Sequence, residues 1–158
     1  MSLISPPAQT CCFTGHRGID PAALAPLVAR EIARAASRGY TRFISGMAVG
    51  FDLLCARVVL KYKDTGAPVA LECALPCEGQ TRFWGARERA LYETVLRRAD
   101  RVTVLSPVYT PSCMALRNRY MVDSSTLVIA RTDGRQSGGT FQTLEYARSL
   151  EREIIFIE

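Results

Sequence analysis

Three glycine-containing turns each follow an apolar segment of the chain and precede a segment with helical spacing. They are Gly15-His16-Arg17-Gly18, Ser45-Gly46-Met47-Ala48-Val49-Gly50 and Ser137-Gly138-Gly139-Thr140. Glycine lets backbone N–H groups approach a ligand closely, and a helix N-terminus offers unpaired donors and partial positive charge. One such turn is typical of any tight connection, but three at one edge of a sheet favour a cradle for a phosphate group.

Polar side chains in or beside these turns could complete such a site. Arg17 could clamp a phosphate with two parallel hydrogen bonds, or simply lie in solvent. His16, the one histidine of the chain, could bind a base or a ribose, or pack. Asp52 could hold ribose hydroxyls or cap the helix that follows. The predicted ligand- and phosphate-binding residues are Gly15, His16, Arg17, Ser45, Gly46, Gly50, Asp52, Arg117, Asn118, Gly138, Gly139 and Thr140.

Four side chains at or near this edge could belong to the site or have another role. Arg117 and Asn118 interrupt an otherwise apolar helix, and they face either the site or solvent. Trp84 is either a core anchor or a stacking platform for a base. Glu78 follows a predicted strand and is a weaker candidate for a carboxylate at the edge of the site.

The elements that would position these residues alternate regularly. Predicted strands cover residues 11–14, 42–45, 69–75, 102–105, 126–130 and 154–157, and predicted helices cover 21–38, 52–63, 81–98, 112–122 and 138–150. This alternation is typical of βαβ units, and short continuously apolar strands fit burial on both faces of a sheet. We expect one α/β domain over residues 1–158, a three-layer Rossmann-like fold with a mostly parallel sheet of about five to six strands.

Composition excludes several classes of protein. With 158 residues, 48% hydrophobic and 22% charged, the chain is typical of a globular domain. No apolar run approaches the roughly 20 residues that span a bilayer. The N-terminal MSLISPPAQT lacks the basic and apolar regions of a secretory signal. We therefore expect a cytoplasmic protein with no membrane partner.

The net charge of +5 could indicate nucleic acid as a partner, but its distribution weakens that reading. The two halves of the chain carry similar charge, and 18 of the 20 basic residues are arginine, which is typical of a compositional bias. A mixed solvated surface is therefore favoured, and nucleic acid is the less favoured partner.

The six cysteines do not form a recognisable metal motif. No C-x2-C pair exists, and the adjacent Cys11 and Cys12 would point to opposite faces of a strand. Cys73 and Cys77 flank a predicted strand end and are the one pair for which a redox role stays open. We expect buried, reduced thiols and no metal.

Taken together, the motifs resemble those of a known family. The segments CCFTGHR, FISGMAVGFDLLCA, CALPCEGQTRFW, ADRVTVLS, RNRYMVD and GGTFQTLEYA, between Cys11 and Ala147, resemble the YpsA-like branch of the SLOG superfamily. The resemblance implies a Rossmann-like fold that binds a nucleotide, a nucleotide derivative or nucleic acid. Relatives in the superfamily include the Lonely Guy phosphoribohydrolases and the single-strand-DNA-binding protein DprA.

The enzymatic motif of the Lonely Guy proteins, G-G-x-G-T-x-x-E, is not reproduced. Its glutamate falls on Thr143 or on Tyr146, depending on which threonine is aligned. Glu145 fits neither register, because it lies about 140° around the helix from Thr143. Glu145 is therefore another weaker candidate, and no catalytic residue is assigned.

These observations lead to three hypotheses. The first is binding of a nucleotide or nucleotide-derived ligand at the C-terminal edge of the sheet, in a sensor or regulatory role and without a further cofactor. The alternatives are a nucleoside-monophosphate N-glycosidase and a single-stranded nucleic-acid binder. Whether the chain is an enzyme, and whether it forms a homo-oligomer, stays open.

Overall fold

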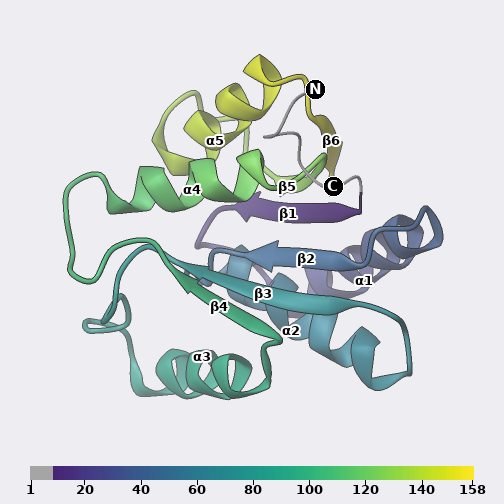
Figure 1. Ribbon diagram of the computed structural model, residues 1–158, viewed down its shortest axis with the longest axis horizontal. Helices are drawn as coiled ribbons and strands as arrows, with labels where there is room; N and C mark the ends of the chain where they lie inside the picture. The colour runs from purple at the N-terminus through teal and green to yellow at the C-terminus, as the bar shows by residue number, and fades with distance from the viewer. Residues whose placement is uncertain (1–8) are drawn as a thin grey trace.

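The computed structural model describes residues 9–158, which form a six-stranded, fully parallel sheet and five helices (Figure 1). The first eight residues, on which the prediction about a secretory signal depends, lie outside the described part. The strands, which pair in the order β4-β3-β2-β1-β5-β6, are β1 (Thr10–Gly15), β2 (Arg42–Ser45), β3 (Ala70–Leu75), β4 (Arg101–Val104), β5 (Leu127–Arg131) and β6 (Glu153–Phe156). The helices are α1 (Pro21–Ser37), α2 (Phe51–Asp64), α3 (Ala86–Arg98), α4 (Cys113–Asp123) and α5 (Gly138–Ser149).

The helices lie in two layers, with α1, α2 and α3 on one face of the sheet and α4 and α5 on the other (Figure 1). Strands β1 to β4 are added in one direction across the sheet, whereas β5 and β6 lie on the other side of β1. Because crossovers between parallel strands are right-handed, reversing direction moves the helices to the opposite face. The prediction of a three-layer, Rossmann-like α/β fold is confirmed.

The N-cap predicted from the sequence is confirmed for α1 and wrong for α2. At α1, Asp20 caps the helix through a 3.4 Å hydrogen bond from the Ala23 backbone N–H, with Pro21 at the first helical position. At α2, the N-cap is Gly50 and the helix begins at Phe51. Asp52 therefore lies inside the first turn, and the reading of Asp52 as the cap is wrong.

Helix α3 begins later than the sequence suggests. Its predicted start at Thr81 is wrong, because residues 81–85 form turns and the helix starts at Ala86. The guanidinium of Arg89 holds these turns by donating to the carbonyls of Thr81 and Arg82 at 2.9 and 3.0 Å. Trp84 accordingly precedes the helix and packs edge-on against Tyr92, with ring centroids 5.2 Å apart.

The sheet separates two apolar cores, and the cysteines follow this division. Cys11 packs with α1 and α2, whereas Cys12 packs with α4 and α5, so the expected opposite orientation is confirmed. All six cysteines are buried and free of disulfides, and burial raises the pKa of Cys12 to about 12. Burial, together with the neighbouring thiol of Cys113, raises the pKa of Cys77. The thiol that acts on Cys77 is thus that of Cys113 in α4 and not that of Cys73 in β3.

A buried carboxylate attaches α4 to the sheet. Glu72 on β3 accepts hydrogen bonds from Arg42 Nε at 2.9 Å, from Thr103 Oγ1 at 2.8 Å and from the Tyr120 hydroxyl. Burial favours a higher pKa for this group, but the hydrogen bonds from Tyr120, Arg42 and Thr103 hold its pKa below the usual range. Glu72 therefore stays ionised and fixes the helix that carries Arg117.

None of the helices between residues 9 and 158 has the length and apolar character needed to cross a bilayer.

Candidate functional site

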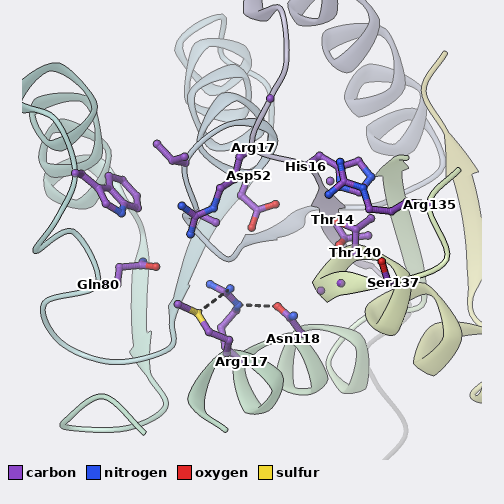
Figure 2. Close-up of a pocket in the computed structure, with 18 residues that line it drawn as sticks. Thr14, His16, Arg17, Asp52, Gln80, Arg117, Asn118, Arg135, Ser137 and Thr140 are labelled. Atoms are coloured by element: carbon purple, nitrogen blue, oxygen red, sulfur yellow. Dashed lines mark hydrogen bonds between the residues drawn. The ribbon is translucent and has the colours of Figure 1, made fainter. Parts of the chain in front are cut away.

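A cavity of about 460 Å³ opens at the C-terminal edge of the sheet, where β1 and β5 end (Figure 2). This volume falls within the range of small-molecule sites. The residues that line it come from five segments and are Thr14, Gly15, His16, Arg17, Gly18, Ala48, Val49, Asp52, Gln80, Trp84, Met114, Arg117, Asn118, Arg135, Ser137, Gly138, Gly139 and Thr140.

The sheet topology explains why the cavity forms at this point. Strands β1 and β5 are adjacent, but the chain leaves β1 toward β2 and leaves β5 toward β6, in opposite directions. The connections after the two strands therefore separate and leave a crevice between them. Such a switch point is where open α/β sheets bind their ligands.

The N-terminus of α5 opens onto this cavity. Ser137, at the N-cap, makes no hydrogen bond from its side chain to the helix, and Gly138, with φ of 88°, begins the first turn. The first backbone N–H groups of a helix have no acceptor within the helix, and they carry partial positive charge. A methyl group placed on Gly139 would have Asn118 Nδ2, at 3.9 Å, as its nearest neighbour, so this turn is not crowded. The turn is suited to bind an anion.

Arginine side chains add positive charge around the same cavity. Arg17 is exposed, and within residues 9–158 its guanidinium makes no hydrogen bond or ion pair. Arg135 pairs with Asp133 at 2.6 Å, and its hydrogen bonds lower the pKa of Asp133 to about 2. His16 Nε2 lies 3.3 Å from Asp133 Oδ1. Arg17 is thus the cation most available to a ligand.

Among the described residues that line the cavity, Asp52 is the one carboxylate. It is 6% exposed, and among the described residues its Oδ1 has no hydrogen-bond partner. Burial raises its pKa to about 6, although the charge of Arg117 and the backbone N–H of Ala48 act in the opposite direction. Such a group can accept a hydrogen bond from a ligand or, in its protonated form, donate one.

Arg117 faces Asp52 from the other side of the cavity (Figure 2), and its charge acts on the carboxyl without an ion pair between the two among the described residues. Its Nη1 donates to the carbonyl of Gly46, its Nε donates to Asn118 Oδ1 at 2.8 Å, and Nη2 lies 3.6 Å from the sulfur of Met114. Burial lowers the pKa of Arg117, an effect that the Asp52 carboxylate opposes. A methyl group on Gly46 would lie 2.8 Å from Arg117 Nη1 and 2.9 Å from Asp52 Oδ2, so only glycine leaves room for both side chains.

Three of the predicted residues lie behind the cavity wall rather than on its surface. Gly46 is one of them. Ser45 is fully buried and donates to the backbone carbonyl of Asp52 at 2.8 Å. Gly50, with φ of 94°, packs against the backbone of Arg17. These residues brace the connection between β2 and α2.

The two weaker carboxylate candidates lie away from the cavity. Glu78 is exposed and is not among the lining residues. Glu145 is exposed and lies 3.7 Å from Arg148 on the same helix. The remaining predicted residues line the cavity, and Trp84 does so while also packing against Tyr92.

Sequence reasoning missed several lining residues. Gln80 directly precedes the segment 81–98 that was predicted as helix, and its amide donates to the Tyr92 hydroxyl at 3.3 Å. Met114 lies one turn before Asn118 on α4, and that spacing could have found it. Arg135 lies two residues before Ser137, so proximity to the third glycine turn was the available signal.

Two known proteins share sequence similarity with much of the chain. It is 29% identical over 119 residues to the uncharacterized SPbeta prophage-derived protein YoqJ of Bacillus subtilis (strain 168), covering 68% of this chain and 69% of that protein. It is 26% identical over 140 residues to UPF0398 protein BH1768 of Halalkalibacterium halodurans, covering 87% and 73% of the two chains.

Solved structures share the fold at low identity. DNA processing protein A from Helicobacter pylori, described for its single-stranded DNA binding mode, superposes with a TM-score of 0.63 at 18% identity. The match covers 98% of this chain and 66% of that one. The structural-genomics target TM1055 superposes with a TM-score of 0.59 at 14% identity, covering 92% and 72%.

The family assignment rests on a sequence match that includes all five segments of the cavity. The YpsA family model, described as the YspA SLOG family, matches residues 14–155. The chain therefore belongs to the YpsA branch of the SLOG family.

Proposed function

We propose that the chain binds a phosphate-bearing nucleotide or nucleotide derivative in the cavity at the ends of β1 and β5. The observation that carries this proposal is that the N-terminus of α5, with no side-chain cap, and the guanidinium of Arg17, unpaired among the described residues 9–158, line the same cavity. A helix N-terminus with open N–H groups binds phosphate, and an arginine adds charge-assisted hydrogen bonds.

The rest of the cavity suits the nucleoside. Oδ1 of Asp52, which has no hydrogen-bond partner within the described part of the chain, can accept a hydrogen bond from a ribose hydroxyl or from a base N–H. Trp84 offers an aromatic surface and Gln80 an amide, both of which can contact a base. The cavity thus combines anion-binding donors at α5 with polar and aromatic groups on the opposite side.

Binding can be tested by adding a negative charge to the first turn of α5. We expect Gly139→Asp to weaken binding of a nucleoside 5′-phosphate by tenfold or more, because a carboxylate would face the phosphate. The fold should survive, since the site is open and an acidic residue in the first turn stabilises a helix. Isothermal titration with nucleoside mono- and diphosphates measures the affinity, and thermal unfolding reports stability.

The matched control is Gly139→Asn, which has the same size without the charge and should keep most of the affinity. Arg17→Ala provides a second, independent loss of binding. Unchanged affinity in both Gly139→Asp and Arg17→Ala would overturn the assignment.

Hydrolysis of a nucleoside 5′-monophosphate is a second candidate function, favoured by Asp52 alone. With a pKa of about 6, a protonated Asp52 could donate its proton to the departing base. Water would add at the C1′ carbon, giving free base and ribose 5-phosphate. Chromatography of products from a panel of nucleotides tests this. Turnover should fall at least a hundredfold in Asp52→Asn, and turnover retained in that variant would exclude Asp52 as the acid.

Single-stranded nucleic acid is a third candidate, supported by the net charge of +5 and by the resemblance in fold to DNA processing protein A. Affinity for a strand that contacts several phosphates should fall steeply as salt rises. Binding confined to one phosphate should depend only weakly on salt, which separates this candidate from the first.

A further inference from the structure

A second, smaller cavity of about 190 Å³ lies in the groove between α4 and α5, beside the main one. Asn118 lines both cavities, so the two adjoin at this side chain. The groove is lined by Ala115, Asn118 and Arg119 of α4 and by Gln142, Thr143 and Tyr146 of α5. The small side chain of Ala115 leaves the groove open between the two helices.

One wall of the groove is a stacked pair of flat groups. The guanidinium of Arg119 lies 4.7 Å from the centroid of the Tyr146 ring. The ring is held in place because its hydroxyl donates to Asp123 Oδ1 at 2.5 Å. Within residues 9–158, Arg119 forms no ion pair with a carboxylate. Guanidinium planes and aromatic rings both stack on nucleobases, and the exposed amide of Gln142 can pair with a base edge.

The junction between the two cavities is suited to a phosphate. Asn118 Oδ1 is occupied by Arg117 Nε at 2.8 Å, which leaves the Asn118 amide N–H groups to donate (Figure 2). A methyl group on Gly139 would lie 3.9 Å from Asn118 Nδ2, so that amide faces the first turn of α5. Thr143, which lines the groove, donates to the carbonyl of Gly139 at 2.8 Å. Through Thr143 and Asn118 the groove therefore adjoins the first turn of α5, which lines the main cavity.

We propose that the groove between α4 and α5 holds a second nucleoside, joined to the nucleoside in the main cavity through a phosphodiester at the N-terminus of α5. This proposal rests on the proposed function and narrows its ligand class to a dinucleotide unit. In this arrangement the second base stacks on the face of the Arg119 guanidinium that points away from the Tyr146 ring, and Asn118 donates to the bridging phosphate.

The test compares dinucleotides with mononucleotides on the full chain. The probes are ApA, CpC, GpG and UpU and the corresponding nucleoside 5′-monophosphates, titrated calorimetrically. We expect at least one dinucleotide to bind about tenfold or more tightly than its mononucleotide, because each stacked base adds this much. Arg119→Ala and Gln142→Ala should remove the excess while leaving mononucleotide affinity unchanged.

The matched control is Arg148→Ala, which removes one positive charge from α5 outside both cavities and should change neither affinity. Mononucleotide binding without any gain for a dinucleotide would overturn the second subsite and leave the proposed function standing. A loss of equal size for both ligand classes in Arg119→Ala would also overturn it. Failure of every probe to bind would overturn both proposals.

Discussion

Replacing Asp52 with asparagine is expected to raise the free energy of unfolding by roughly 3 kcal/mol at pH 7.5. Burial raises the pKa of this carboxyl from its ordinary value near 3.8 to about 6, and the attraction of Arg117 does not offset that cost. The folded state therefore binds the proton more tightly than the unfolded chain does. Stability from this group is fully present below pH 3.8 and is lost as the pH rises through 6. Asparagine keeps the shape and remains neutral.

The pH dependence gives the measurement and its control. Denaturant unfolding of the wild type and of Asp52→Asn should give curves that differ above pH 6 and converge near pH 4. Asp133 is the matched control of opposite sign, because hydrogen bonds from Arg135 lower its pKa to about 2. Asp133→Asn should reduce stability above pH 4. A constant difference between wild type and Asp52→Asn from pH 4 to pH 8 would contradict the titration of Asp52.

Replacing Gly50 with alanine is expected to destabilise the protein by roughly 2–4 kcal/mol. The residue has φ of 94°, which L side chains rarely adopt. A methyl group there would lie 2.4 Å from the carbonyl oxygen of Arg17 and 2.5 Å from its Cα. These are backbone atoms, and the adjacent His16 carbonyl is bound to the Phe51 N–H at 3.1 Å, so the loop cannot move away freely.

Gly134→Ala separates the cost of the positive φ from the cost of the close contact with Arg17. Gly134 has φ of 88°, close to that of Gly50, but a methyl group there would have no neighbour within 4 Å. We expect a loss of only about 1 kcal/mol for this variant, from the backbone conformation alone. Urea unfolding of both variants gives the comparison. Equal losses would show that the contact with Arg17 does not matter.

These two predictions concern neighbouring residues at the connection between β2 and α2 and in the first turn of α2. Gly50 lets this connection pass against Arg17, and Gly46 leaves room for Arg117 beside Asp52. The buried carboxylate costs stability, and binding sites commonly carry such costs. We expect ligand binding at Asp52 to recover part of that stability.

The sequence predicts the fold well because each element has a local physical signal. Strand β2 has the predicted bounds, Arg42–Ser45, and α1 starts after Asp20 and ends before Gly39 as expected. The largest departure from the predicted bounds is the start of α3. Phe83 and Trp84 continue a helical apolar pattern in the sequence, yet Phe83 is 88% exposed. The turn before Gly85 is held by hydrogen bonds from Arg89, which lies seven and eight residues further along the chain.

For the candidate site too, some features follow from the sequence and others only from the tertiary structure. By itself, the sequence determined the alternating elements and therefore a parallel sheet, whose strand ends bring glycine turns to one edge. Tertiary structure alone decided that Arg117 enters the space beside Asp52, and that Ser45 and Gly50 brace the wall instead of facing the cavity. The groove at Arg119 likewise depends on how α4 packs against α5. The physical reason is that glycine turns and helix caps depend on neighbouring residues, whereas burial, pKa and cavity shape depend on residues far apart in the chain.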